Sequence, residues 1–399
     1  MPWAKFFAGY GADIRWQGLL RGQCFFVFVV AFVVNAKTAS AQYTITDLGT
    51  LGGLTAQPGS PPPSSEAFGI NNSGQVVGYA LTASRVKHAF LESNGSMTDL
   101  GTFGSSFSIA MGINGSGQIA VTSFNTVTTN TAAYLYSNGK TTNLGTLGGS
   151  SAETNGIDND GQATGDSVNA SGGDHAFLYS SGHMTDLGTL GGASSRGYGV
   201  NDSGEVVGFS QTSTGTAAFL YSGGQMINFN NLLPADSNWT AFSATGINDG
   251  GQVVGAMNEG GNIVHGFLYS NGTTTDLGTI GTNELTDWSY AEGVNDLGEV
   301  VGYSTYNAYT AFLYSNGQMI NLNSLLPTGA QAAGWYLGDA TAINDEGQIV
   351  GWGWTPAGHV DAFLLSPTSL PEPSSLAMLS LICLLLPRWR DDRVDKRRG

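Results

Sequence analysis

The chain repeats one short phrase along most of its length, and this repeat constrains the fold more than any other feature. The phrase is Gly-Ile-Asn or a near variant, followed by a turn and by Gly-Gln or Gly-Glu. Its apolar residue recurs at intervals of 43, 44, 43, 47, 47 and 49 residues, at Ile70, Ile113, Ile157, Val200, Ile247, Val294 and Ile343. A period in the forties that carries only strand and turn signals is typical of a propeller blade, whereas helical repeats of similar length show helical periodicity.

Two further phrases recur with the same period. Variants of Ala-Phe-Leu-Tyr have their central aromatic residue at Phe90, Tyr134, Phe177, Phe219, Phe267, Phe312 and Phe363, and variants of Asp-Leu-Gly-Thr begin at Asp47, Asp99, Asn143, Asp186, Asn228, Asp276 and Asn321. The intervening turns are rich in Asn-Gly and Asp-x-Gly, which supply the positive φ of tight hairpins. With 59 glycines and 11% charged residues, the composition also favours short strands over helices.

The two ends of the repeat array complement each other. Residues 43–50 read as the second strand of a unit without its first, and residues 361–366 read as a first strand without its second. Pairing of these strands would leave the array with no unpaired edge. We therefore predict an all-β fold over residues 42–366: a seven-bladed β-propeller of four-stranded antiparallel blades, closed by pairing of its N- and C-terminal strands. A β-solenoid is the alternative.

The segments outside the array carry the patterns of export and sorting. Residues 1–41 combine scattered basic residues, an apolar run at 24–34 and the small residues Ala39-Ser40-Ala41, which is the order of a secretory signal peptide cleaved after Ala41. The apolar run is well short of the ~20 residues of a membrane-spanning helix. Residues 367–399 hold Pro371, Glu372 and Pro373, an apolar stretch at 376–386 and an arginine-rich end, which predicts a stop-transfer element in the inner membrane.

The C-terminal tail and the repeats each resemble a known family. The tail resembles the PEP-CTERM sorting signal of exopolysaccharide-producing Gram-negative bacteria, through Pro371-Glu372-Pro373, Ser374-Ser375-Leu376, the apolar helix and the basic end. The resemblance implies that an exosortase, a membrane cysteine protease, recognises and removes this tail. Pro387, Asp391, Asp392 and Asp395 depart from the pattern. The repeats resemble the HAF repeat of extracellular proteins, through His88-Ala89-Phe90 and His175-Ala176-Phe177, which implies an address and a shape but no agreed activity.

Charge and cysteine content exclude several classes of function. Residues 42–366 hold 25 acidic and four basic residues, a net charge of −21. Nucleic-acid binding is therefore excluded, because phosphate contacts need Lys and Arg. Both cysteines, Cys24 and Cys383, lie in the segments expected to be removed, so the processed chain would have no disulfide, thiolate metal site or cysteine nucleophile.

Three tryptophans precede successive Gly-Ile-Asn phrases and are the candidate ligand-binding residues. We expect Trp239, Trp288 and Trp335 in equivalent loops, with Asp287, Glu292 and Asp339 nearby to accept hydrogen bonds from sugar hydroxyls. The alternative is that each ring fills the gap between neighbouring blades, as buried aromatic residues commonly do. We expect no cofactor and no metal site beyond weak surface calcium, because the turn 158–161 lacks the bidentate carboxylate that ends a calcium loop.

Catalytic motifs are missing from the sequence. No G-x-S-x-G elbow, H-E-x-x-H helix or Walker loop occurs, and His88, His175 and His265 are interpreted as strand-edge residues that bond to the backbone. We expect a non-enzymatic, exported and surface-sorted protein, a structural or carbohydrate-binding component of the cell envelope or exopolysaccharide matrix. Its partners would be signal peptidase, exosortase and an extracellular polysaccharide. The alternatives are a polysaccharide lyase or glycoside hydrolase on a propeller scaffold, and a calcium-dependent adhesion module.

Overall fold

The computed structural model describes residues 43–53, 64–234, 237–260, 263–281, 287–306 and 308–368. These residues lie within one compact unit of the chain. The expected signal peptide with Ala39 and Ala41, and the expected sorting tail with Pro371, Glu372 and Pro373, lie outside the described residues. Among the described residues, no helix is both long enough and apolar enough to cross a membrane.

The described strands form five four-stranded sheets and one eight-stranded sheet. Two of the four-stranded sheets come first along the chain: β2 (Ser65–Ile70), β3 (Val76–Leu81), β4 (Lys87–Ser93) and β5 (Ser96–Gly101), then β6 (Phe107–Ile113), β7 (Ile119–Phe124), β8 (Thr131–Ser137) and β9 (Lys140–Asn143). The eight-stranded sheet follows, with β10 (Gly148–Ile157), β11 (Ala163–Asn169), β12 (Asp174–Ser180), β13 (His183–Asp186), β14 (Gly191–Val200), β15 (Val206–Thr212), β16 (Thr216–Ser222) and β17 (Gln225–Asn228). Its two halves are joined by a single parallel pair, Asp174 with Ser194.

The remaining sheets repeat the same antiparallel order. They contain β18 (Thr240–Ile247), β19 (Val253–Asn258), β20 (Val264–Ser270) and β21 (Thr273–Asp276), then β22 (Ser289–Val294), β23 (Val300–Tyr306), β24 (Ala308–Ser315) and β25 (Gln318–Asn321). The last sheet joins β26 (Tyr336–Ile343), β27 (Ile349–Trp354) and β28 (Val360–Pro367) to β1 (Tyr43–Asp47). The 3₁₀ helices η1 (Phe229–Leu232) and η2 (Leu322–Leu325) and the helix α1 (Thr328–Ala333) are the helical elements described.

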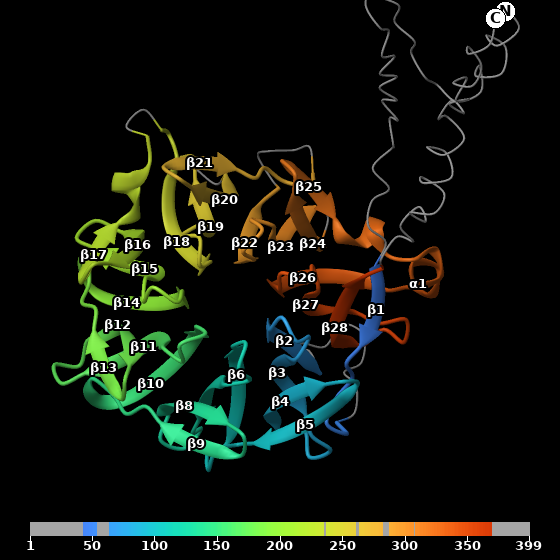
Figure 1. Cartoon of the computed structure of the whole chain (residues 1–399), viewed down its shortest axis with the longest axis horizontal. Helices are drawn as coiled ribbons and strands as arrows, with labels where there is room; N and C mark the ends of the chain where they lie inside the picture. Colours follow the sequence, from blue (N-terminus) through green and yellow to red (C-terminus); the bar gives the residue numbers. More distant parts are fainter. Residues whose placement is uncertain are drawn as a thin grey trace, which may run out of the picture. The chain divides into compact units, whose positions relative to one another are not determined.

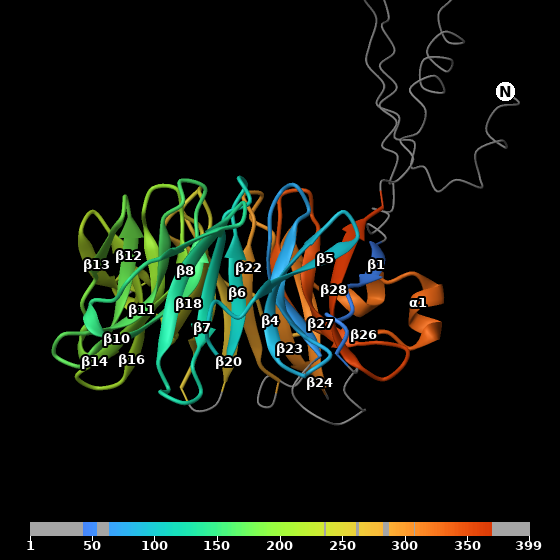
Figure 2. The ribbon, with the colours of Figure 1, turned by 90° about the horizontal axis from the view of Figure 1, so that it is seen from below.

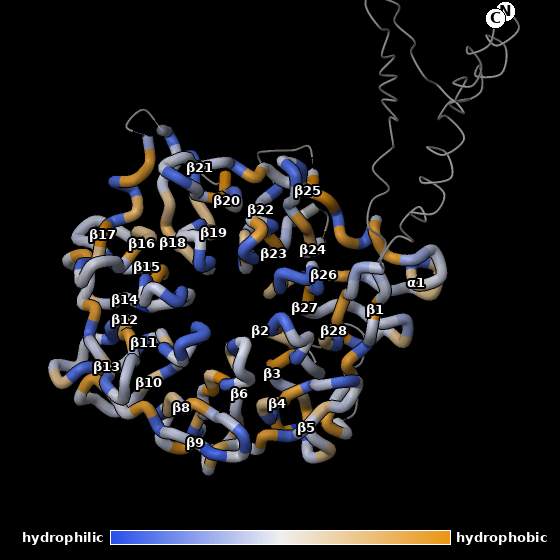
Figure 3. The backbone as a smooth tube through the Cα atoms, viewed as in Figure 1, coloured by the Kyte–Doolittle hydropathy of each residue, from blue (hydrophilic) through white to orange (hydrophobic). Residues whose placement is uncertain are grey.

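The sheets are arranged like blades around a central axis, as in a β-propeller (Figure 1). Seen from the side, the strands stand next to one another along that axis (Figure 2). The Gly-Ile-Asn phrase forms the end of the first strand of a sheet, so β2, β6, β22 and β26 lie nearest the axis. Figure 3 shows hydrophilic segments where the strands approach the axis.

The hydrophobic core lies between neighbouring sheets. One cluster joins Val77 and Ala89 of the first sheet to Ala110 and Val121 of the next. Another joins Ala67, Val76 and Phe90 to Val350 and Ala362 of the last sheet, so the beginning and the end of the array pack against each other. The aromatic residue of Ala-Phe-Leu-Tyr is fully buried in six copies, Phe90, Phe177, Phe219, Phe267, Phe312 and Phe363. A sheet therefore completes its core only against its neighbours.

The first and last of the described strands pair in one sheet. β1 pairs antiparallel with β28, with Tyr43 opposite Pro367 and Asp47 opposite Phe363. Ser65 adds a link between the first and last sheets, because its Oγ accepts a hydrogen bond of 2.9 Å from the Ala362 N–H and donates one of 2.6 Å to the Gly49 carbonyl. Tyr43 is buried in this arrangement.

Glycine is required in the Val-Val-Gly phrase of the second strand. A Cβ on Gly351 would overlap the carbonyl oxygen of Asp339, and one on Gly78 would overlap that of Glu66. The first strand shifts its register beside these glycines, between Ala340 and Ala342 and between Ala67 and Gly69. Strand interiors with glycine commonly mark such close backbone approaches.

We predict that Ser195→Ala destabilises the protein by about 1–3 kcal/mol, the cost of leaving buried polar groups unpaired. Ser195 is 1% exposed, and its Oγ accepts from the Ala176 N–H at 2.9 Å and donates to the Gly188 carbonyl at 2.5 Å, which ties the two halves of the eight-stranded sheet together. Urea unfolding of the whole protein measures the change. Ser213→Ala, in an exposed turn, is the control, and equal stability of the two variants would contradict the expected role of Ser195.

Candidate functional site

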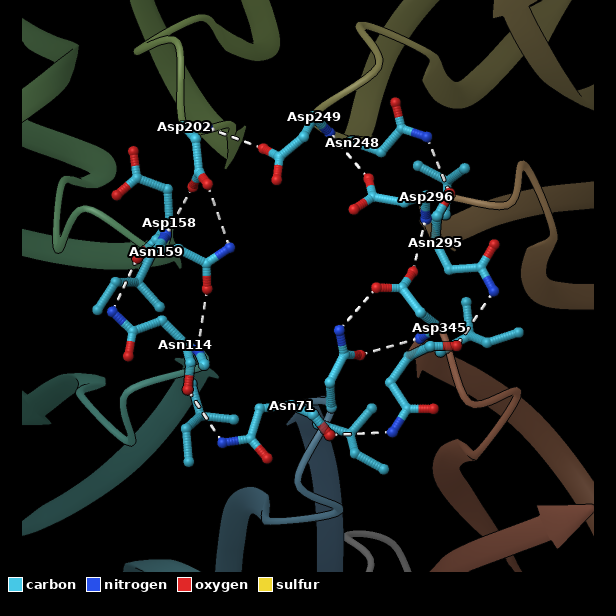
Figure 4. Close-up of a pocket in the computed structure, with 18 of the residues that line it drawn as sticks. Asn71, Asn114, Asp158, Asn159, Asp202, Asn248, Asp249, Asn295, Asp296 and Asp345 are labelled. Atoms are coloured by element: carbon cyan, nitrogen blue, oxygen red, sulfur yellow. Dashed lines mark hydrogen bonds between the residues drawn. The ribbon is translucent and has the colours of Figure 1, made fainter.

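The turns that follow the first strands enclose a pocket of about 230 Å³ near the central axis (Figure 4). Its wall is built from the same two or three positions of successive repeats, the apolar residue of the Gly-Ile-Asn phrase and the polar residues that follow it. The described wall includes five carboxylates, those of Asp158, Asp202, Asp249, Asp296 and Asp345. The pocket is therefore strongly acidic.

Asparagine side chains link each of these turns to the next. Asn71 Nδ2 donates to the Asn114 carbonyl at 3.0 Å, and Asn114 Nδ2 donates to the Asp158 carbonyl at 2.8 Å. The same bond runs from Asn201 to Asn248, from Asn248 to Asn295, from Asn295 to Asn344 and from Asn344 to Asn71. Each asparagine Oδ1 also accepts from the backbone N–H four residues later, as Asn71 does from Gln75. One side chain thus fixes its own turn and the position of the next sheet.

Asp158 interrupts this series because a carboxylate has no proton to donate. It is 5% exposed, and its two oxygens accept from the N–H and from Nε2 of Gln162, at 2.7 and 2.6 Å. Burial, together with the nearby charges of Asp202 and Asp160, raises the pKa of Asp158 to about 6 despite these hydrogen bonds. The turn keeps its shape but lacks the bond to its neighbour.

A second series runs through the residues that follow the asparagines. The backbone N–H of Asp202 donates to Asp249, that of Asp249 to Asp296, and that of Asp296 to Asp345, at 2.9–3.1 Å. Asn159 and Asp345 make the corresponding bonds to Asp202 and Asn72. In the part of the chain that the structure describes, no group of three or more His, Cys, Asp or Glu residues is placed to hold a metal ion. We assign four of the five carboxylates, those of Asp202, Asp249, Asp296 and Asp345, to holding neighbouring turns together, whereas Asp158 bonds within its own turn.

A continuous run of seven aromatic rings crosses three neighbouring sheets. Consecutive ring centroids are 5.2–6.3 Å apart, in the order Phe242 (β18), Tyr290 (β22), Tyr303 (β23), Tyr309 (β24), Trp352 (β27), Trp354 (β27) and Tyr336 (β26). The Tyr290 and Tyr303 rings stack with an interplanar angle of 14°. Tyr309 is 51% exposed, and the other rings are partly exposed. We call these seven residues the aromatic run.

Two of the expected site residues, Glu292 and Asp339, adjoin the aromatic run. Asp339 is directly opposite Trp352 in the strand pair β26–β27, and Glu292 lies in β22 two residues after Tyr290. Burial raises the pKa of Glu292 to about 7. Burial and the charges of Glu292 and Glu66 raise the pKa of Asp339 well above its usual range. These carboxyl groups therefore sit close enough to repel one another, and Asp339 Oδ1 is buried without a hydrogen-bond partner.

The three expected tryptophans lie in different surroundings. Trp239 packs against the core cluster of Phe229 and Phe267, and its ring centroid is 5.1 Å from that of His265. Trp335 packs against another cluster, which contains Leu337. Trp288 is 42% exposed, and the neighbouring Asp287 is buried. Among the described residues, no ring contact joins two of these tryptophans, and none of the three is part of the aromatic run.

Sequence reasoning missed all seven rings of the run and the carboxylate of Glu66. A signal for two of the rings, Tyr303 and Trp352, exists at the residue after Val-Val-Gly or Ile-Val-Gly, which is Tyr79, Phe209, Tyr303 and Trp352 in four of the repeats. This residue pairs with the one four places before the apolar residue of Gly-Ile-Asn, as Tyr303 pairs with Tyr290 and Trp352 with Asp339. The other repeats have Thr, Asp or Ala at the position that corresponds to the residue after Val-Val-Gly. Packing therefore does not fix the residue type there.

The histidines contact carboxylates instead of the backbone that the sequence suggested. His88 Nδ1 is 2.9 Å from Asp99, His175 Nδ1 is 2.8 Å from Asp186, and His265 Nδ1 is 2.9 Å from Asp276. Each pair links the third strand of a sheet to the fourth, and each aspartate also accepts from a backbone N–H two residues later. The repetition of the pair with the blades identifies it as part of the scaffold.

Comparison with known families gives a match over part of the chain. Residues 236–362 match the model of a family described as a protein of unknown function, DUF3466. No curated protein matches the chain.

Several solved structures resemble this one at low identity. TolB from Acinetobacter baumannii has 12% identity and a TM-score of 0.42, with 74% of this chain and 64% of TolB covered. A puromycin-hydrolysing peptidase of Mycobacterium tuberculosis has 9% identity and a TM-score of 0.45, with 81% of this chain and 58% of the peptidase covered. The Aleuria aurantia lectin AAL, in complex with Fucα1-6GlcNAc, has 11% identity and a TM-score of 0.30, with 78% of this chain and 100% of the lectin covered.

We predict that Asp158→Asn stabilises the protein at pH 7–8 by about 1–3 kcal/mol, because an amide supplies the missing donor toward the next turn and carries no buried charge. A raised pKa in the folded state means that Asp158 costs stability as the pH rises from its unfolded value near 4 through about 6. The advantage of asparagine should therefore shrink at pH 5. Thermal unfolding across this pH range measures it, with the exposed Glu346→Gln as control. An unchanged melting temperature at pH 8 would refute the interpretation.

Proposed function

We propose that this chain is an exported, surface-sorted propeller that binds carbohydrate as a component of the cell envelope or exopolysaccharide matrix. The propeller would have seven blades and be closed by its terminal strands. In support, the eight-stranded sheet divides at one parallel pair into two four-stranded halves. The pairing of β1 with β28 and the bond from Asn344 to Asn71 further support a closed ring.

The observation that carries the binding function is the aromatic run with its adjoining carboxylates. Sugar rings present C–H faces that pack well on aromatic side chains, and hydroxyl groups around the sugar edge donate hydrogen bonds to carboxylates. Six centroid contacts in series give a surface long enough for several sugar units, as an extended polysaccharide requires. Tyr309 is exposed and the other six rings are partly exposed, so each ring of the run has surface that a ligand could contact.

Export and sorting rest on the terminal segments. We propose that signal peptidase cleaves after Ala41 and that the tail with Pro371, Glu372 and Pro373 anchors the protein in the inner membrane until an exosortase removes it. The strongly acidic composition is compatible with an extracellular location next to polysaccharide.

Hydrolysis of the bound glycan is a second candidate. Glycoside hydrolases use two carboxyl groups, one of which is protonated near neutral pH. Glu292, with a pKa of about 7, and Asp339 have this property and adjoin the aromatic run. Release of reducing ends from a bound glycan, lost in Glu292→Gln, would establish this activity, and binding without release would exclude it.

We predict that Tyr309→Ala weakens glycan binding about five- to thirtyfold, the effect of losing 1–2 kcal/mol, while the melting temperature hardly changes. Tyr309 is 51% exposed and central in the aromatic run, so its removal takes away contact surface but little core. A glycan array followed by titration of each bound glycan measures the effect. Trp288→Ala is the matched control, a similarly exposed ring outside the run. Loss of binding in the Trp288 variant alone would move the site to the loop that precedes β22.

A further inference from the structure

The carboxylates near the central axis differ in whether the chain itself neutralises them. Arg196 in β14 forms ion pairs with two carboxylates. Its Nε is 2.7 Å from Asp166 Oδ1, and its terminal nitrogen is 3.9 Å from Glu153 Oε2. Lys87 acts on Glu66 in the first sheet through the attraction of opposite charges. Among the described residues, Glu292 and Asp339 take part in no ion pair. The two carboxylates beside the aromatic run therefore lack a cation.

The first sheet shows how an ammonium group fits this environment. Glu66 and Tyr79 face each other across β2 and β3, and Lys87 Nζ lies 3.9 Å from the centroid of the Tyr79 ring. The ammonium thus combines a cation–π contact with attraction to a neighbouring carboxylate. Glu66 belongs to the first strand, Tyr79 to the second and Lys87 to the third.

The last sheet has the same arrangement without the ammonium. Asp339 faces Trp352 as Glu66 faces Tyr79. The position of Lys87, which pairs with Leu81, is taken by Val360, which pairs with Trp354. Tryptophan is the best aromatic partner for a cation, and Tyr303 and Tyr309 lie in the same run of rings. Asp339 Oδ1 is buried without a hydrogen-bond partner. The carboxyl group has hydrogen bonds to the Ala340 backbone and to Trp352, but no cation of the described residues pairs with it.

We infer that the glycan bound at the aromatic run carries free amino groups, and that an ammonium group of the sugar takes beside Asp339, Glu292 and Trp352 the place that Lys87 takes beside Glu66 and Tyr79. The ligand class is a polymer of hexosamine with unacetylated amines. This inference rests on the proposed carbohydrate-binding function and specifies its ligand. Anionic polysaccharides are disfavoured at the same surface, because two carboxylates would face their uronate groups.

The test compares three probes of equal length on the whole protein at pH 7.5, above the pKa of about 7 of Glu292: glucosamine oligomers, N-acetylglucosamine oligomers and galacturonate oligomers. We expect the glucosamine oligomer to bind at least tenfold more tightly than its acetylated counterpart and the galacturonate oligomer most weakly. The double variant Glu292→Gln with Asp339→Asn should lose that preference and still bind the acetylated oligomer. Its melting temperature, expected to be unchanged or higher because two buried acids without an ion pair are gone, shows that it is folded.

Two controls separate a specific site from general attraction to an acidic protein. Glu346→Gln removes an exposed negative charge and should leave the preference intact, and the preference should persist when the salt concentration is raised to 0.5 M. Equal loss in the Glu346 variant, or disappearance of the preference in salt, would overturn the inference. So would a lysine-rich peptide that competes as well as the glucosamine oligomer.

The outcomes also distinguish this inference from the function on which it rests. Equal binding of acetylated and free-amine oligomers, reduced in both cases by Tyr309→Ala, would overturn the amine preference and leave the carbohydrate-binding function standing. Failure of every glycan to bind, or binding insensitive to Tyr309→Ala, would overturn the proposed function itself.

Discussion

The bond from an asparagine side chain to the next turn is the interaction on which the rest of this structure depends. A four-stranded sheet of this chain has no complete core of its own, because the hydrophobic clusters take residues from two neighbouring sheets or from the two halves of the eight-stranded sheet. Side-chain packing alone permits neighbouring sheets to slide past each other, whereas a directional hydrogen bond such as Asn248 to the Asn295 carbonyl, at 2.8 Å, fixes their relative height. Since the donor, Asn248, also caps its own turn through Oδ1, turn shape and sheet placement are specified by one residue.

Some positions near the axis are not fixed by packing, by hydrogen bonding between turns or by close backbone approach. The apolar residue, the asparagine and the glycine of each repeat are fixed by packing, by hydrogen bonding and by close backbone approach. None of these constraints fixes the residue type four places before the apolar residue. In successive repeats this residue is Glu66, Ile109, Glu153, Arg196, Ser243, Tyr290 or Asp339. Its partner on the second strand varies with it, as in the pairs Glu153 with Asp166 and Asp339 with Trp352. The repeats therefore differ in side-chain chemistry mainly at these paired positions of the first and second strands, while the fixed positions keep the same residue types.

The sequence predicted the strands and turns well because their signals are local. The Gly-Ile-Asn, Val-Val-Gly and Ala-Phe-Leu-Tyr phrases each form one strand, and the positive-φ glycines, such as Gly74 and Gly204, fall in the expected turns. The aromatic run could not be read in the same way, because its members lie between residues 242 and 354 and meet only when three sheets pack together. Tryptophan is conspicuous in a sequence, but loop position alone did not indicate that Trp239 and Trp335 turn back onto the core while Trp352 borders the carboxylates.

The contrast between the first and last sheets shows why the carboxylates beside the aromatic run are informative. Burying an unpaired carboxylate costs free energy, and a chain selected for stability alone would replace it or supply a cation. The first sheet supplies Lys87, and the middle of the array supplies Arg196 to two acids. At Asp339 and Glu292 the chain keeps two acids whose pKa values are raised by burial, with the charge of Glu292 adding to the rise at Asp339. In the first sheet a lysine stands at the position that Val360 takes in the last sheet. Two buried acids that have no cation inside the chain are the basis of our inference that a cation from outside pairs with them.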